Sequence, residues 1–235
     1  MKIVVLDGYG LNPGDLSWSA WETLGELKVY DRTSPSELLE RSEGAEVLIT
    51  NKTLITANDM ALLPELKYIG VLATGYNVVD IDEAKARGIV VTNIPAYSTA
   101  SVAQMVFAHI LNITQRVGYY ADENVRGRWT NNADFCYWDT PLIELADKQM
   151  GIIGFGRTGS AVAHLARAFG MKVLAYDKYP AEGLDNGDTV RYVALEELFA
   201  CSDIISLHCP LTAENTGMIS TETIAKMKDG AILIN

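Results

Sequence analysis

The stretch Gly151-Ile152-Ile153-Gly154-Phe155-Gly156-Arg157-Thr158-Gly159 decides the fold of this chain of 235 residues. An apolar run leads into glycines spaced Gly-x-Gly-x-x-Gly, and a segment rich in alanine and leucine follows them. This order predicts a buried strand, a tight turn and the start of a helix. Gly154 would make the turn, Gly156 would let the backbone approach a pyrophosphate, and Gly159 would let helix and strand pack closely. The helix N-terminus would then offer N–H groups to the phosphates.

An acidic residue stands where a dinucleotide site needs one. The next apolar run ends at Tyr176, and Asp177 follows Gly159 at close to the roughly 20 residues expected for the ribose-binding acid. A carboxylate at this position binds the ribose hydroxyls and repels a 2′-phosphate, so NAD is favoured over NADP, although the adjacent Lys178 weakens that preference. The alternative interpretation of Asp177 is an acid on a surface loop.

Short apolar runs alternate with amphipathic segments along the whole chain. We expect strands over residues 3–6, 27–30, 47–49, 68–72, 89–91, 150–153, 173–176, 190–193, 203–207 and 231–234. We expect short helices over residues 17–24, 36–43, 58–63, 80–87, 157–169, 195–200 and 221–228. Apolar strands separated by helices indicate parallel sheets that are covered on both faces. The chain is therefore predicted to be α/β, with two doubly wound domains in series.

One long helix is predicted to join the two domains. Apolar residues recur there at spacings of three and four, and they would form one stripe: Val102, Val106, His109 or Ile110, Ile113 and Val117. Gly118 and Gly127 mark its far end. The segment 128–142 that follows holds Trp129, Phe135, Tyr137 and Trp138. So many aromatic residues in an irregular loop indicate packing against the chain itself or a second subunit.

Composition excludes several classes of protein. The formal net charge is −11, which opposes sequence-independent binding to nucleic acid or to an anionic membrane. The 3 cysteines are too few for a disulfide framework or a zinc knuckle, so we expect no metal site and a cytoplasmic, reducing environment. No apolar run approaches the roughly 18 residues that span a bilayer.

Ligand groups are expected beyond the carboxyl ends of the strands. In the first domain these are residues 51–52, 73–77 and 92–95. The turn at Gly75 would present N–H groups to a carboxylate, or it would be an ordinary strand-to-helix turn. From the residues alone, His208 is the candidate proton donor, because His109 lies beside an apolar stripe and His164 faces outward.

Several motifs in order resemble those of one family. They are residues 73–77, 91–99, 154–159, 208–212 and 230–235. Together they resemble the D-isomer-specific 2-hydroxyacid dehydrogenases, and within that family the glycerate dehydrogenases, also called hydroxypyruvate reductases. The resemblance implies an NAD-dependent enzyme that moves a hydride between the nicotinamide and C2 of a small 2-hydroxy or 2-oxo acid.

The resemblance also implies a domain plan and a set of binding residues. A flavodoxin-like substrate-binding domain would cover residues 1–98, with its C-terminal return segment missing, and a truncated Rossmann-type NAD-binding domain would cover residues 99–235. Substrate would meet the loop formed by Thr74, Gly75, Tyr76 and Asn77, with Thr74 also near the nicotinamide. The remaining cofactor contacts would be Gly154, Gly156, Arg157, Thr158, Gly159, Asp177, His208, Cys209, Pro210 and Thr216. A homodimer would form through the long helix and loop 128–142.

The resemblance revises the choice of proton donor. In the family the acid is a later histidine paired with a glutamate, and an arginine follows the strand that ends at Asn235. No catalytic residue is therefore expected within residues 1–235. Because the sequence stops directly after the apolar run 231–234, we expect the chain to be part of a longer protein.

Two alternatives remain open at this stage. The first is a same-family enzyme for another 2-oxoacid or for a phosphorylated hydroxy acid, although Lys52 is the only obvious cation for a phosphate. The second is an NAD(H)-sensing interaction protein of the corepressor type, which the strong acidity of the chain disfavours.

Overall fold

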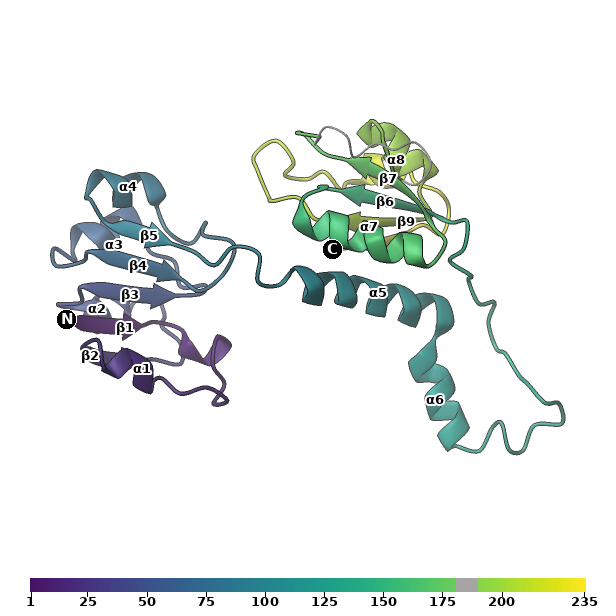
Figure 1. Cartoon of the computed structure of the whole chain (residues 1–235), viewed down its shortest axis with the longest axis horizontal. Helices are drawn as coiled ribbons and strands as arrows, with labels where there is room; N and C mark the ends of the chain where they lie inside the picture. Colours follow the sequence, from purple (N-terminus) through teal and green to yellow (C-terminus); the bar gives the residue numbers. More distant parts are fainter. Residues whose placement is uncertain (181–189) are drawn as a thin grey trace. The chain divides into compact units, whose positions relative to one another are not determined.

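The chain forms two compact α/β units in the computed structural model, which describes residues 1–180 and 190–235. The units comprise Met1–Tyr97 and Ser98–Asn235. Each has a parallel five-stranded sheet with helices packed around it (Figure 1). The predicted fold class is confirmed. None of the helices in the described ranges is long and apolar enough to cross a membrane.

The first unit has the strand order β2-β1-β3-β4-β5, which is typical of flavodoxin-like folds. Its strands are β1 (Lys2–Val5), β2 (Glu26–Val29), β3 (Val47–Thr50), β4 (Tyr68–Val71) and β5 (Val90–Thr92). Its helices are the 3-10 helix η1 (Gly8–Gly10), α1 (Ser19–Glu22), α2 (Leu38–Ser42), α3 (Ala57–Ala61) and α4 (Ile81–Ala86). The central strands are buried on both faces, as their continuous apolar runs predict.

The second unit has the strand order β10-β9-β6-β7-β8. Its strands are β6 (Gln149–Ile153), β7 (Lys172–Tyr176), β8 (Val190–Tyr192), β9 (Ile204–Leu207) and β10 (Ile232–Ile234). Its helices are α5 (Thr99–Gln115), α6 (Val117–Val125), α7 (Arg157–Ala168), α8 (Leu195–Cys201) and α9 (Thr221–Ile224). The strand order changes direction beside β6, so the turn after β6 lies at the position where such sheets bind ligands.

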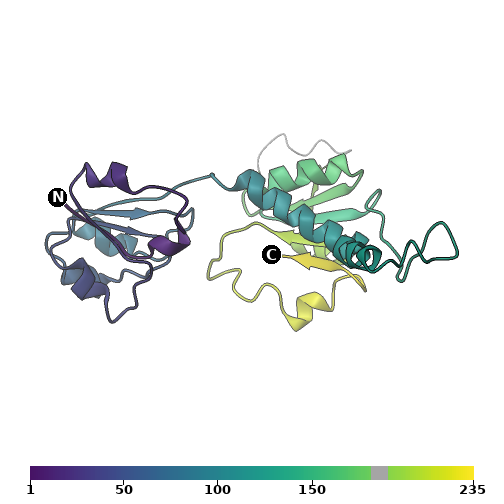
Figure 2. The ribbon, with the colours of Figure 1, turned by 90° about the horizontal axis from the view of Figure 1, so that it is seen from below.

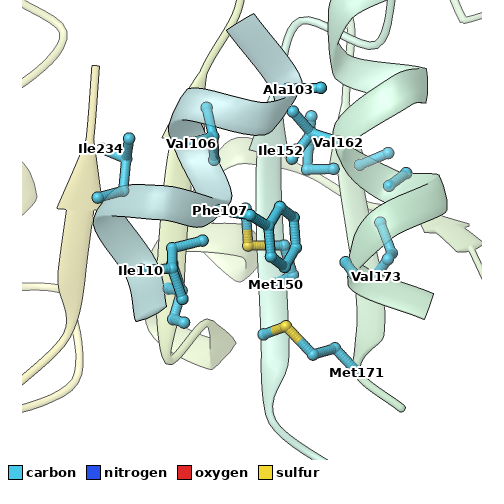
Figure 3. Close-up of a cluster of buried hydrophobic side chains, with 14 of the residues drawn as sticks. Ala103, Val106, Phe107, Ile110, Met150, Ile152, Val162, Met171, Val173 and Ile234 are labelled. Atoms are coloured by element: carbon cyan, nitrogen blue, oxygen red, sulfur yellow. The ribbon is translucent and has the colours of Figure 1, made fainter. Parts of the chain in front are cut away.

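Helices α5 and α7 pack side by side against one face of the second sheet (Figure 2). Phe107 and Ile110 of α5 point toward Met150 and Ile152 of β6, with Val162 of α7 beside them (Figure 3). All five of these side chains are buried. This cluster holds the start of α7 against the end of β6.

The long helix departs from its prediction in two ways. It breaks at Arg116, which has a φ of 50° and separates α5 from α6. The predicted stripe is also wrong in part, because Val102, Ile113 and Val117 are 38%, 48% and 60% exposed. The buried residues of α5 are Ala103, Val106, Phe107, Ile110 and Thr114. Both faces carry apolar residues at helical spacing, and packing on α7 and β6 selects one of them.

Candidate functional site

The turn after β6 requires glycine for steric reasons. Gly154 has a φ of 92°, and a Cβ there would lie 2.5 Å from the Cys209 nitrogen. The strand ends are this close because the His208 N–H donates to the Ile153 carbonyl at 2.7 Å. A Cβ on Gly159 would lie 2.2 Å from the Gly154 carbonyl oxygen, so α7 approaches the turn as closely as its backbone allows.

Gly156 differs from these two glycines because it faces open space. It is the N-cap of α7, and a Cβ there would have no atom of the described residues within 4 Å except those of its chain neighbours. The first N–H groups of an α-helix have no partner within the helix, and they attract anions. Gly156 therefore leaves room for an anionic group to approach the start of α7.

Asp177 lies at the end of β7, beside this turn. Its Oδ2 accepts a hydrogen bond from the Phe155 N–H at 2.7 Å, and its Oδ1 accepts one from the Tyr179 N–H at 2.8 Å. A carboxylate offers about four lone-pair positions, so roughly two remain for other donors. The two backbone bonds fix the carboxylate next to the turn, with capacity left for a pair of ribose hydroxyls.

A cavity of about 660 Å³ opens beside the turn. Its lining includes most of the predicted cofactor-binding residues: Gly154, Gly156, Asp177, His208, Cys209, Pro210 and Thr216. Gly159 is buried beneath the turn, and Arg157 and Thr158 begin α7. Thr74 belongs to the first unit and does not line this cavity.

Sequence reasoning missed a large part of the opposite wall, which is formed by residues 212–218. Asn215 organises this wall, because its Oδ1 accepts from the Thr212 N–H at 2.7 Å and its Nδ2 donates to the Pro210 carbonyl at 2.7 Å. Lys178 and Glu214 form an ion pair at the cavity. Within 212–218, Thr216 is the only predicted cofactor contact and Thr212 ends the motif 208–212, whereas no local pattern marks Glu214, Asn215, Gly217 or Met218.

His208 lines the cavity at the end of β9. Its Nε2 lies 2.8 Å from the hydroxyl oxygen of Ser206, which is fully buried. Burial lowers the pKa of His208 below its ordinary value near 6.5. This environment does not favour the protonated form of the ring, which is the form that donates a proton to a substrate.

This environment predicts a pH dependence of stability. Below about pH 6.5 the unfolded chain protonates His208 and the folded chain resists it, so stability should fall as the pH drops from about 7 toward 5. The contribution of one histidine is at most about 1.4 kcal/mol per pH unit. Urea unfolding at pH 7.5 and 5.5 measures the fall, and His208→Asn should reduce it. An unchanged fall in that variant would contradict the prediction.

The first unit gathers its predicted loops at one edge of the sheet. The carboxylate of Asp7 accepts hydrogen bonds from the N–H groups of Asn51, Lys52 and Thr53. The side chain of Asn93 donates to the Thr74 carbonyl at 2.8 Å, which joins the loops after β4 and β5. The residues from Thr74 to Asn77 are exposed at this edge.

Among the described residues, no group of His, Cys, Asp and Glu could hold a metal ion.

Comparison with known proteins identifies the family. Residues 107–235 match the model of the D-isomer specific 2-hydroxyacid dehydrogenase, NAD binding domain. The chain belongs to this dehydrogenase family. It is 52% identical over 238 residues to the hydroxypyruvate reductase of Blautia hydrogenotrophica, covering 100% of this chain and 74% of that one. It is 40% identical to the glycerate dehydrogenase of Methylorubrum extorquens, covering 100% of this chain and 71% of that one.

Solved structures of dehydrogenases and reductases share the fold. The D-lactate dehydrogenase of Aquifex aeolicus, complexed with NAD and lactic acid, has a TM-score of 0.83 and 34% identity, covering 100% of this chain and 68% of that one. An acyclic imino acid reductase in complex with NADPH and D-Arg has a TM-score of 0.82 and 30% identity, covering 100% of this chain and 74% of that one.

The residues of this dehydrogenase fit NAD. The space beside Gly156 lies at the start of a helix, and the carboxylate of Asp177 retains capacity for hydroxyl groups. The adjoining cavity of about 660 Å³ lies within the usual range for sites that bind small molecules and cofactors. The chain is accordingly an NAD-binding oxidoreductase that acts on CH–OH groups.

Proposed function

We propose that this dehydrogenase interconverts hydroxypyruvate and D-glycerate. The observation that carries the proposal is the 52% identity to a hydroxypyruvate reductase across the whole chain. The residues at the edge of the first sheet agree with a small, unphosphorylated acid. Residues 51–53, 73–77 and 92–95 contain one basic side chain, Lys52, whereas a phosphorylated acid would favour several cations.

One unit would bind the substrate and the other would bind NAD. Residues 1–98 would bind the substrate, with the N–H groups around Gly75 receiving its carboxylate. Residues 99–235 would bind NAD. There, the start of α7 would receive the pyrophosphate through the N–H groups of Arg157 and Thr158, and Asp177 would receive the adenosine ribose.

Bound NAD(H) supplies the hydride chemistry, and the protein supplies position and electrostatics. The loop containing Thr74 and Gly75 would orient the 2-oxo acid, and the half-buried His208 would line the adenine side with Cys209, Pro210 and Thr216. The resemblance assigns proton donation to a histidine that follows Asn235, together with a glutamate and an arginine. We propose a cytoplasmic location, supported by three free cysteines.

The proposed function is tested with the natural full-length protein. Oxidation of NADH is followed with hydroxypyruvate, glyoxylate, pyruvate and a phosphorylated 3-carbon oxoacid, and kcat/KM is compared among them. We expect hydroxypyruvate to be preferred by at least about tenfold. A preference for another acid overturns the substrate assignment, and binding of NADH without turnover of any acid favours a sensing role.

We also propose a homodimer formed through α5, α6 and residues 128–142. This segment exposes large apolar side chains, including Trp129 at 57%, Phe135 at 88% and Trp138 at 70%. It is nevertheless ordered by polar contacts: the Tyr119 hydroxyl donates to Asp139 at 2.6 Å, and Arg128 pairs with the same carboxylate. An ordered apolar surface of this kind is typical of a protein–protein interface.

The proposed dimer predicts that a substitution in its interface lowers the molecular mass of the protein in solution. Phe135→Asp should raise the dissociation constant of the dimer by about 100-fold or more, because an unpaired charge would be buried in the interface. Light scattering after size exclusion, over a range of concentrations, measures the change. Leu16→Asp, at a 67% exposed residue of the first unit, is the control and should remain dimeric. A monomeric wild-type protein at micromolar concentration would overturn the proposal.

A further inference from the structure

The ion pair between Lys178 and Glu214 lies beside the acid that would receive the ribose. Lys178 follows Asp177 directly, and the cavity lining includes Asp177, Lys178 and Glu214. The Lys178 ammonium contacts the Glu214 carboxylate, and their side chains are 56% and 71% exposed. Glu214 comes from the wall that Asn215 organises, 36 residues later in the chain.

A lysine at this position has a clear chemical consequence for coenzyme choice. A 2′-phosphate on the adenosine ribose would meet the Asp177 carboxylate, which repels it, and the Lys178 ammonium, which attracts it. Without a partner, Lys178 would offset part of the repulsion between Asp177 and the 2′-phosphate. Glu214 pairs with the ammonium at the same cavity, so the ion pair presents no net positive charge to a phosphate.

We propose that Glu214 is a specificity-determining residue that excludes NADP(H), by neutralising the positive charge of Lys178. Discrimination by this dehydrogenase therefore has two parts. Asp177 selects for the free ribose hydroxyls, and Glu214 removes the affinity for phosphate that Lys178 would otherwise provide. The hydrogen bond to the Glu214 carboxylate also raises the pKa of the Lys178 ammonium.

The proposal is tested by the ratio of the dissociation constants of NADPH and NADH. Calorimetric titration of the chain with each reduced coenzyme gives both constants without any substrate. Glu214→Gln should lower the ratio by about tenfold, which corresponds to about 1.4 kcal/mol. The gain should shrink at high salt, because both side chains are exposed to solvent. Lys178→Met in the same background should return the ratio close to that of the wild type.

A matched pair in the same unit provides the control. Lys172 and Asp147 also form an exposed ion pair, with 3.4 Å between Nζ and Oδ1, and neither lines the cavity. Asp147→Asn removes the same unit of charge and should leave the ratio unchanged. The proposal is overturned if Glu214→Gln leaves the ratio as it was, if Asp147→Asn lowers it equally, or if the gain persists without Lys178.

Discussion

Gly159→Ala is expected to lower the free energy of unfolding of the unit Ser98–Asn235 by about 2–3 kcal/mol. The added Cβ would lie 2.2 Å from the Gly154 carbonyl oxygen and 3.0 Å from Cγ2 of Ile152. The first of these is a backbone atom of a turn that is itself tightly packed, so it cannot rotate away as a side chain can. Helix α7 would have to move off β6, which would disturb the cluster around Phe107 and Met150. Urea unfolding followed by circular dichroism measures the loss.

Gly118→Ala is the matched control for this prediction. Gly118 lies in α6, and a Cβ there would meet only the Asn112 Oδ1, at 4.0 Å, among the described residues. The same chemical change should be neutral or stabilise by up to about 1 kcal/mol, because alanine favours helix more than glycine does. If both variants unfold at the wild-type urea concentration, the close approach of α7 to the turn is not what requires glycine at position 159.

The strands and the cofactor turn could be predicted because their signals are local. Each buried parallel strand is a short apolar run, so all ten predicted strands are present within a residue or two of their expected bounds. The glycine pattern of residues 154–159 carries its steric reason in the sequence, and β6 and α7 flank it as expected. The spacing from Gly159 to Asp177 follows from the length of one helix and one strand.

The buried face of α5 could not be predicted, because its selection depends on distant residues. Val102 and Val106 are both apolar and four residues apart, yet α7 and β6 bury only the second. The break between α5 and α6 at Arg116 could not be predicted either, because a non-glycine residue with positive φ carries no clear sequence signal. The last helix, α9, ends earlier than the apolar pattern suggested.

The same limit applies to the candidate site. The sequence places Lys178 next to Asp177, but its partner Glu214 comes from a different loop, and no spacing rule connects Lys178 with Glu214. The hydrogen bonds from Asn51 and Lys52 to Asp7 likewise join residues that are distant in sequence. Charged residues that modify a site from another loop are identified only in the three-dimensional structure. The steric requirements of a single turn can be predicted from the sequence.

Gly156→Ala is expected to raise the dissociation constant of NADH by about 100-fold, with little change in stability. A hundredfold loss corresponds to about 2.7 kcal/mol. The new methyl group would meet no described residue beyond its chain neighbours within 4 Å, so the fold can accept it. It would instead fill the space through which a pyrophosphate approaches the start of α7. Alanine is a poorer N-cap than glycine, so the free energy of unfolding should fall by no more than about 1 kcal/mol.

Calorimetric titration with NADH and a urea unfolding curve on the same sample separate the two effects. Gly118→Ala, outside the cavity, should bind NADH as the wild type does. If Gly156→Ala bound NADH with the affinity of the wild type, the coenzyme phosphates would not approach the backbone at this residue. That result would contradict the proposed binding of the pyrophosphate at the start of α7. A large loss of stability would mean that the space beside Gly156 is required for folding. Only a loss of affinity without a loss of stability fits a glycine that keeps room for the coenzyme.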